Sequence, residues 1–118
     1  MYQTWPPVDR PNQFQGSIES YELAAADIGG EVFPVARAWL AVWERDPAIA
    51  LSSDGLHASV AGSYLAALVM YAGIFDRTPV GLPATVRTRG VAVVRVDPAL
   101  TRTLQEAAAS VTTTASSR

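Results

Sequence analysis

The chain has 118 residues, of which 49% are hydrophobic and 17% are charged, and its formal net charge is −2. This length fits one small domain and excludes two full ones, and the hydrophobic content argues against disorder over the whole chain. The nine basic residues are all arginines scattered along the sequence, so no basic surface for nucleic acid is predicted.

The sequence contains no cysteine and a single histidine. We therefore expect no disulfide, no metal site and no other cofactor, and the cellular compartment stays open. The first ten residues lack the pattern of a secretory signal. The longest uncharged run, 58–75, is interrupted by serine and glycine, which favours a buried helix over a membrane span.

The N-terminal third predicts a strand end followed by a helix. Residues 1–5 have strand composition and run into Pro6 and Pro7, which cannot continue a ladder. From Ser17 the apolar residues follow helical spacing, and a Gly-Gly pair at 29–30 predicts the end of the helix. The predicted buried stripe consists of Ile18, Tyr21, Ala25 and Ile28.

A short strand at 31–33 is expected to lead into a second helix, with Pro34 in its first turn and Asp46 at its end. Four apolar residues of this helix share one face, namely Val35, Trp39, Val42 and Trp43. Both tryptophans are interpreted as core residues, although a pair at this spacing is also compatible with an acyl pocket.

A third helix is predicted over 59–75, with Ser59 as its N-cap and apolar side chains nearly all round. Residues 77–96 have no clear assignment: Pro79, Gly81 and Pro83 mark a loop, and 91–96 has strand composition without a clear partner. The pair Asp97 and Pro98 predicts the start of a last helix. Its buried stripe is expected to contain Leu100, Leu104, Ala107 and Val111, and 112–118 to form a frayed polar tail.

This order of elements predicts an α/β protein that is mostly helical, with helices covering a parallel sheet. Two short strands do not make a stable sheet, because a parallel pair leaves backbone edges unpaired and needs cover on both faces. We therefore expect the chain to be the C-terminal half of a larger domain.

Asp54 and His57 are the residues whose spacing suggests chemistry. A carboxylate three residues before an imidazole can reach a ring nitrogen, orient the ring and stabilise its charged form. Gly55 permits the tight backbone path between them. A purely structural alternative stays open at this point, in which Asp54 caps a turn and His57 stands at a helix start.

The residues around this pair resemble a known family. Residues 53–59, Ser-Asp-Gly-Leu-His-Ala-Ser, and 62–67, Gly-Ser-Tyr-Leu-Ala-Ala, are similar to the last sequence block of the SGNH hydrolases, also called GDSL-type esterases and lipases. The family pattern is Asp-x-x-His, and Ala58 stands where proline is common. Weaker similarity extends back to Trp5 and forward to 104–108.

The resemblance implies a three-layer α/β/α fold, with residues 1–111 as its C-terminal half. It implies that Asp54 orients His57 and that His57 is the general base that activates a serine against an ester. Trp5, at the expected catalytic edge of the sheet, is a candidate for the substrate pocket. The Gly-Asp-Ser and Gly-x-Asn-Asp blocks of the family do not occur here, so the chain alone is expected to be inactive.

Two alternatives to the interpretation of the chain as half of an esterase stay open. In one, the chain is a non-catalytic remnant or interaction module that hides its sheet edge in a homo-oligomer or a complex. In the other, a separate polypeptide complements the chain with the first strands and the serine. The substrate, whether an acyl lipid, an acetylated sugar or another ester, is not predicted.

Overall fold

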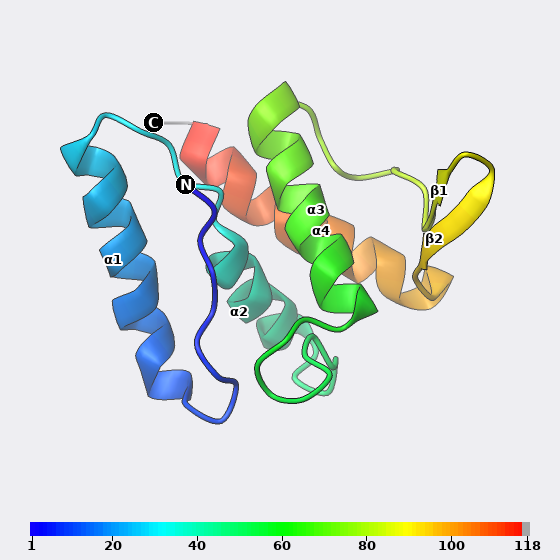
Figure 1. Ribbon diagram of the computed structural model, residues 1–118, viewed down its shortest axis with the longest axis horizontal. Helices are drawn as coiled ribbons and strands as arrows, with labels where there is room; N and C mark the ends of the chain where they lie inside the picture. Colours follow the sequence, from blue (N-terminus) through cyan, green and yellow to red (C-terminus); the bar gives the residue numbers. More distant parts are fainter. Residues whose placement is uncertain (117–118) are drawn as a thin grey trace.

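Helices form about half of the structure, and the only regular sheet among the described residues is a hairpin (Figure 1). The computed structural model describes residues 1–116. The elements are a 3₁₀ turn at Pro11–Gln13, α1 at Phe14–Asp27, α2 at Val35–Arg45, α3 at Val60–Phe75, β1 at Thr85–Thr88, β2 at Val91–Arg95 and α4 at Pro98–Ser116. The predicted mixed α/β class is confirmed, with about half of the chain in helices.

α1 begins three residues earlier than the apolar spacing predicts. A 3₁₀ turn leads directly into it, and Phe14 starts the buried stripe with its ring edge-on to Trp43, the centroids being 5.6 Å apart. The glycine stop is confirmed, because Gly29 has the left-handed φ of 63°. The prediction for Ile28 is wrong: the chain leaves the helix before this residue, and its side chain is 70% exposed.

α2 is confirmed with one correction at its start. Pro34 does not lie in the first turn; with a ψ of 61° it precedes the helix as its N-cap residue. Its carbonyl oxygen accepts a hydrogen bond from the backbone N–H of Ala38 at 3.0 Å. Trp39 is fully buried and Trp43 is partly buried against the same cluster, so both belong to the core as predicted.

α3 begins as the sequence predicts. The Ser59 hydroxyl accepts from the backbone N–H of Gly62 at 3.2 Å, and the helix ends where Asp76 takes a left-handed φ of 50°. Leu65, Leu68 and Val69 belong to the face that is buried against α2 and α4, whereas Ile74 and Phe75 at the C-terminal end are exposed. Within residues 1–116, no helix combines the length and the apolar content needed to cross a membrane.

The segment near residue 91 that has strand composition does pair with another strand. β2 pairs antiparallel with β1, which follows the predicted loop in a segment that had no clear assignment from the sequence. The two strands are joined at Arg89 and Gly90, which have φ values of 53° and 78°. Positive φ at both turn residues suits a two-residue hairpin, but Arg-Gly is a weaker sequence signal for it than Asn-Gly.

α4 starts at Pro98 as predicted, and the Asp97 carboxylate accepts from the backbone N–H of Ala99 at 2.9 Å. Leu104 is fully buried where α4 packs against α2 and α3. The helix runs to Ser116, so its backbone is helical over the first part of the predicted frayed tail. Residues 117–118 of that tail lie outside the described residues.

The two predicted N-terminal strands form only a single parallel bridge, between Tyr2 and Phe33. Gln3 donates its backbone N–H to the Phe33 carbonyl at 3.1 Å, and Phe33 donates to the Met1 carbonyl at 2.6 Å. In this pattern the N–H and C=O groups of Tyr2 and Val32 face outward from the pair, and neither residue has a backbone partner among residues 1–116.

Helices lie on both sides of this parallel pair (Figure 1). On one side, the Thr4 hydroxyl is 2.8 Å from the Tyr21 hydroxyl of α1. On the other side, the Trp5 ring stacks on Trp39 of α2, with centroids 4.0 Å apart. The N-terminal segment is therefore held between α1 and the group formed by α2, α3 and α4.

Replacing Gly62 by alanine tests the close approach of α3 to the loop before it. A Cβ here would clash with the carbonyl oxygen of Leu51 and would lie 3.1 Å from Cζ2 of Trp39. We expect Gly62→Ala to lower the free energy of unfolding by about 1–3 kcal/mol, the usual cost of overpacking. Urea denaturation followed by circular dichroism measures the change.

Gly16→Ala is the matched control, because Gly16 also lies inside a helix and a Cβ there meets no atom within 4 Å. Alanine has the higher helix propensity, so this variant should gain up to about 1 kcal/mol. Equal unfolding free energies for the two variants would contradict the close contact at Gly62.

Candidate active site

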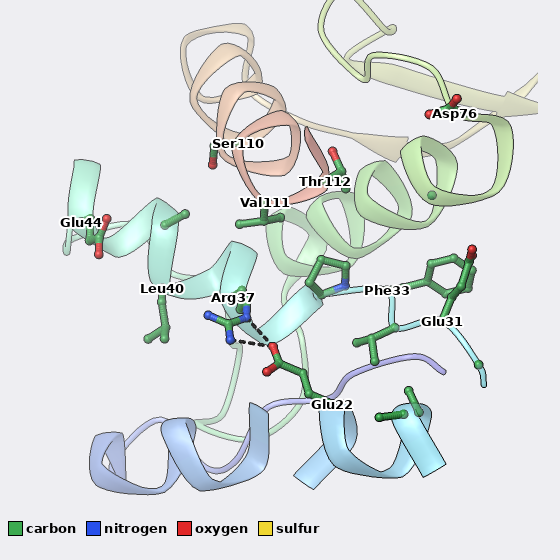
Figure 2. Close-up of a pocket in the computed structure, with 17 residues that line it drawn as sticks. Glu22, Glu31, Phe33, Arg37, Leu40, Glu44, Asp76, Ser110, Val111 and Thr112 are labelled. Atoms are coloured by element: carbon green, nitrogen blue, oxygen red, sulfur yellow. Dashed lines mark hydrogen bonds and ion pairs between the residues drawn. The ribbon is translucent and has the colours of Figure 1, made fainter. Parts of the chain in front are cut away.

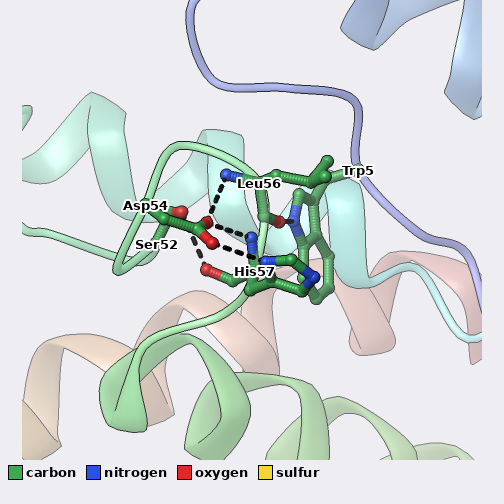
Figure 3. A network of polar contacts seen from close by, with 5 residues as sticks. All are labelled: Trp5, Ser52, Asp54, Leu56 and His57. Atoms are coloured by element: carbon green, nitrogen blue, oxygen red, sulfur yellow. Dashed lines mark hydrogen bonds and ion pairs between the residues drawn. The ribbon is translucent and has the colours of Figure 1, made fainter.

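Both predicted catalytic residues lie on the loop 51–59 between α2 and α3 (Figure 3). Backbone hydrogen bonds close this loop: Ser59 donates to the Leu51 carbonyl at 2.9 Å, and Ser53 donates to the His57 carbonyl at 3.0 Å. Because Ser59 is also the N-cap of α3, the loop is anchored directly on the start of a buried helix.

The Asp54 carboxylate has two separate functions within the loop. Its Oδ1 atom accepts hydrogen bonds from the backbone N–H groups of Leu56 at 2.9 Å and His57 at 2.7 Å. Its Oδ2 atom lies 2.5 Å from Nδ1 of the His57 ring. Gly55, with a left-handed φ of 88°, supplies the sharp turn that this arrangement needs. Asp54 therefore both caps the turn and orients the imidazole.

The hydrogen bonds at Asp54 also determine its charge. The His57 side chain, followed by the backbone N–H groups of His57 and Leu56, holds the pKa of the Asp54 carboxyl well below its ordinary range. Asp54 is therefore an anion throughout the neutral range. Since a carboxylate only accepts, the hydrogen bond places the proton on Nδ1, which leaves Nε2 of the neutral ring as an acceptor.

The His57 ring is open to solvent. Its side chain is 76% exposed and that of Asp54 is 53% exposed. Among residues 1–116, Nε2 of His57 has no hydrogen-bond partner. The ring thus presents a free basic nitrogen on the outer face of the loop (Figure 3).

Nearby serine hydroxyls point to the backbone and not to this nitrogen. Ser52 donates its hydroxyl to the His57 carbonyl at 2.8 Å, and Ser59 donates to the Ala50 carbonyl at 2.8 Å. Both hydroxyls therefore stabilise the loop. No serine of the described chain pairs with the imidazole as a nucleophile would.

Trp5 holds the loop 51–59 in place through a hydrogen bond to its backbone. Its indole Nε1 donates to the Leu56 carbonyl at 2.7 Å, and its ring lies on Trp39 with an interplanar angle of 18°. A second bond from the same segment joins the Val8 N–H to the Gly55 carbonyl at 2.8 Å. Contacts with backbone carbonyls leave no signal in the sequence, so this role was not predicted. The sequence predicted Trp5 as a pocket residue, whereas the structure shows that it holds the loop in position.

Comparison of the chain with protein-family models, with curated proteins and with solved structures gives no match. The chemistry of the site therefore rests on its own residues. In the part of the chain that the structure describes, no group of three or more histidine, cysteine or acidic side chains could hold a metal ion.

A large groove lies away from this loop. It has a volume of about 980 Å³ and runs between α1, α2 and the C-terminal turns of α4, beside the strand segment that contains Val32 (Figure 2). Glu22 of α1 and Arg37 of α2 form an ion pair in it, with Oε1 2.6 Å from Nη2. Neither Asp54 nor His57 lines this groove, so it is not the pocket for chemistry at His57.

Removal of the imidazole tests the electrostatics of the pair. The His57 side chain is the largest cause of the lowered Asp54 pKa, so His57→Ala should raise that pKa towards its ordinary value, while the two backbone N–H donors keep it from rising all the way. The carboxyl carbon of Asp54, followed by NMR during an acid titration, reports this directly. An unchanged midpoint would show that the ring does not contact the carboxylate in solution.

Trp5→Phe separates the hydrogen bond of the indole from its stacking. Phenylalanine keeps a ring on Trp39 but cannot donate to the Leu56 carbonyl. We expect the free energy of unfolding to fall by about 1 kcal/mol, and by clearly more in Trp5→Ala, where the stack is also lost. Urea titrations of the two variants measure this order, and equal losses would mean that the indole N–H contributes little.

Proposed function

We propose that this chain supplies the aspartate and the histidine of a Ser-His-Asp triad that hydrolyses esters, within a fold of the SGNH-hydrolase type. The observation that carries the proposal is the 2.5 Å contact between Oδ2 of Asp54 and Nδ1 of His57, with Nε2 left free. This is the base-and-orienter part of a serine hydrolase site.

In the proposed reaction, a serine hydroxyl attacks the ester carbonyl while Nε2 of His57 accepts its proton. Asp54 stabilises the imidazolium that forms, and His57 then gives the proton to the leaving alcohol. The resulting acyl-serine is hydrolysed by water, with His57 again acting first as base and then as acid. No step in this sequence needs a cofactor.

The arrangement of the N-terminal segment supports a layered fold. Helices lie on both sides of the parallel pair, as in an α/β/α structure. The outward backbone groups of Tyr2 and Val32 are the sites at which further parallel strands would pair. We propose that a further segment, on the same polypeptide or on a second one, adds strands here and brings the serine and the oxyanion donors.

A second candidate function rests on the same open strand edges. A non-catalytic interaction module would also use Tyr2 or Val32 to pair with a partner strand, and Asp54 and His57 would then only close the loop. The two functions differ in one measurable respect: only the first requires the His57 ring for ester turnover.

The test begins with the coding frame upstream of Met1. We expect it, or a gene adjacent to it, to encode Gly-Asp-Ser and Gly-x-Asn-Asp segments. The completed protein should hydrolyse p-nitrophenyl acetate, and His57→Ala should lower kcat/KM by about 10²- to 10⁴-fold. Asp54→Asn should also lower it, because an amide does not stabilise the imidazolium as a carboxylate does.

Asp46→Asn is the matched control, since Asp46 is another exposed aspartate that accepts a backbone N–H, from Ala48 at 2.9 Å. It should leave turnover unchanged. The chain without the added segment should show no more activity than its own His57→Ala variant. Turnover by the completed protein that survives His57→Ala would exclude His57 as the general base of the proposed mechanism, and absence of turnover in the completed protein would favour the interaction module.

A further inference from the structure

A smaller pocket of about 360 Å³ lies between α3 and the β-hairpin. Ala67, Leu68 and Tyr71 of α3 form one wall, and Leu82 and Val86 belong to the other. This volume is near the lower end of the range of about 300–1,000 Å³ that is typical of small-molecule sites, and apolar walls are usual for such sites.

One wall of the pocket is held in place by a buried polar network. The amide nitrogen of Gln105, a residue only 3% exposed, donates to the Leu82 carbonyl at 2.7 Å and to the Tyr64 hydroxyl at 3.1 Å. Tyr64 in turn donates to the Pro83 carbonyl at 2.9 Å. Gln105 also accepts from the Gly81 N–H at 2.9 Å. The loop 81–83 is therefore fixed without a ligand, so the pocket is preformed.

The other distinctive feature is an irregularity in β1. The register of the hairpin shifts between Val86 and Arg87, and both of these consecutive residues line the pocket. In a regular strand successive side chains point to opposite faces, whereas a bulge changes the direction of a side chain. The irregularity thus allows Arg87 as well as Val86 to belong to the lining of a mostly apolar pocket.

Among residues 1–116, Arg87 is the only charged residue in the lining of this pocket. Its guanidinium makes one long hydrogen bond, from Nη1 to the Gly90 carbonyl at 3.5 Å, and it forms no ion pair with residues 1–116. A guanidinium without an ion-pair partner is suited to bind a carboxylate through two parallel hydrogen bonds.

We propose that this pocket binds an amphipathic monocarboxylate, with its alkyl chain between α3 and β1 and its carboxylate on Arg87. The site contains neither Asp54 nor His57. The proposed binding site therefore does not depend on the proposed esterase function. Its test measures ligand binding and not ester turnover.

Calorimetric titration with decanoate, below its micellar concentration, tests the proposal against decanol as a neutral ligand of the same chain length. Decanoate should bind about fivefold more tightly than decanol, the contribution of one exposed ion pair. Arg87→Leu should abolish this preference. Arg95→Leu, on the exposed face of the same hairpin and outside the lining, should retain it.

Ala67→Trp tests the location of the site. Ala67 is exposed to solvent on α3, so a larger side chain there should fill the pocket without disturbing the core. Both ligands should lose binding in this variant and keep it in Ser63→Trp, one turn earlier on the same exposed helix surface. Thermal unfolding of each variant verifies that it is folded.

Three results would overturn the proposal. The first is equal affinity for decanol and decanoate in the unmodified chain, and the second is decanoate binding that persists in Ala67→Trp. The third is dimerisation that Ala67→Trp abolishes while decanoate fails to bind the monomer, which would assign the pocket to a second copy of the chain.

Discussion

The stack of Trp5 on Trp39 is the contact on which the other features depend. Trp39 is fully buried, so the core fixes the position of its ring. Trp5 stacks on this ring and is itself only partly buried. Its indole N–H holds the Leu56 carbonyl. Because Gly62 has no side chain, α3 can approach Trp39 and the Leu51 carbonyl closely. The N-terminal segment, α2, α3 and the loop 51–59 therefore share one packing centre.

The loop shows how one carboxylate can serve both the fold and a reaction. One oxygen of Asp54 satisfies two backbone N–H groups, and the other orients the ring of His57. Loss of the carboxylate would therefore disturb the loop as well as the imidazole. The exposed Nε2 is useful for acyl transfer only beside a nucleophile and oxyanion donors, which usually contribute the largest part of the stabilisation of the transition state. We propose that the strands that carry these groups pair at the outward edges of Tyr2 and Val32.

The central contact of the candidate site was predictable because it is local. Asp54 and His57 are three residues apart, and their spacing alone indicated that the carboxylate could reach the ring. The support of the site was not predictable in the same way. Trp5 reaches a backbone carbonyl 51 positions along the chain, and a carbonyl carries no side-chain identity that a sequence pattern could reveal. The place of Arg87 in the pocket lining was not predicted either, because it depends on the pairing of β1 with β2 and on a register shift in that hairpin.

The sequence by itself determined where the helices lie, because apolar spacing and the caps at Ser59 and Asp97 act within a few residues. It also determined that the two tryptophans of α2 belong to the core. Tertiary structure decided the rest. α1 starts early because Phe14 gains burial against a residue of another helix, and β1 forms because β2 supplies its backbone partners. Such contacts join residues that are distant in the sequence, so their free energy is not contained in any local pattern.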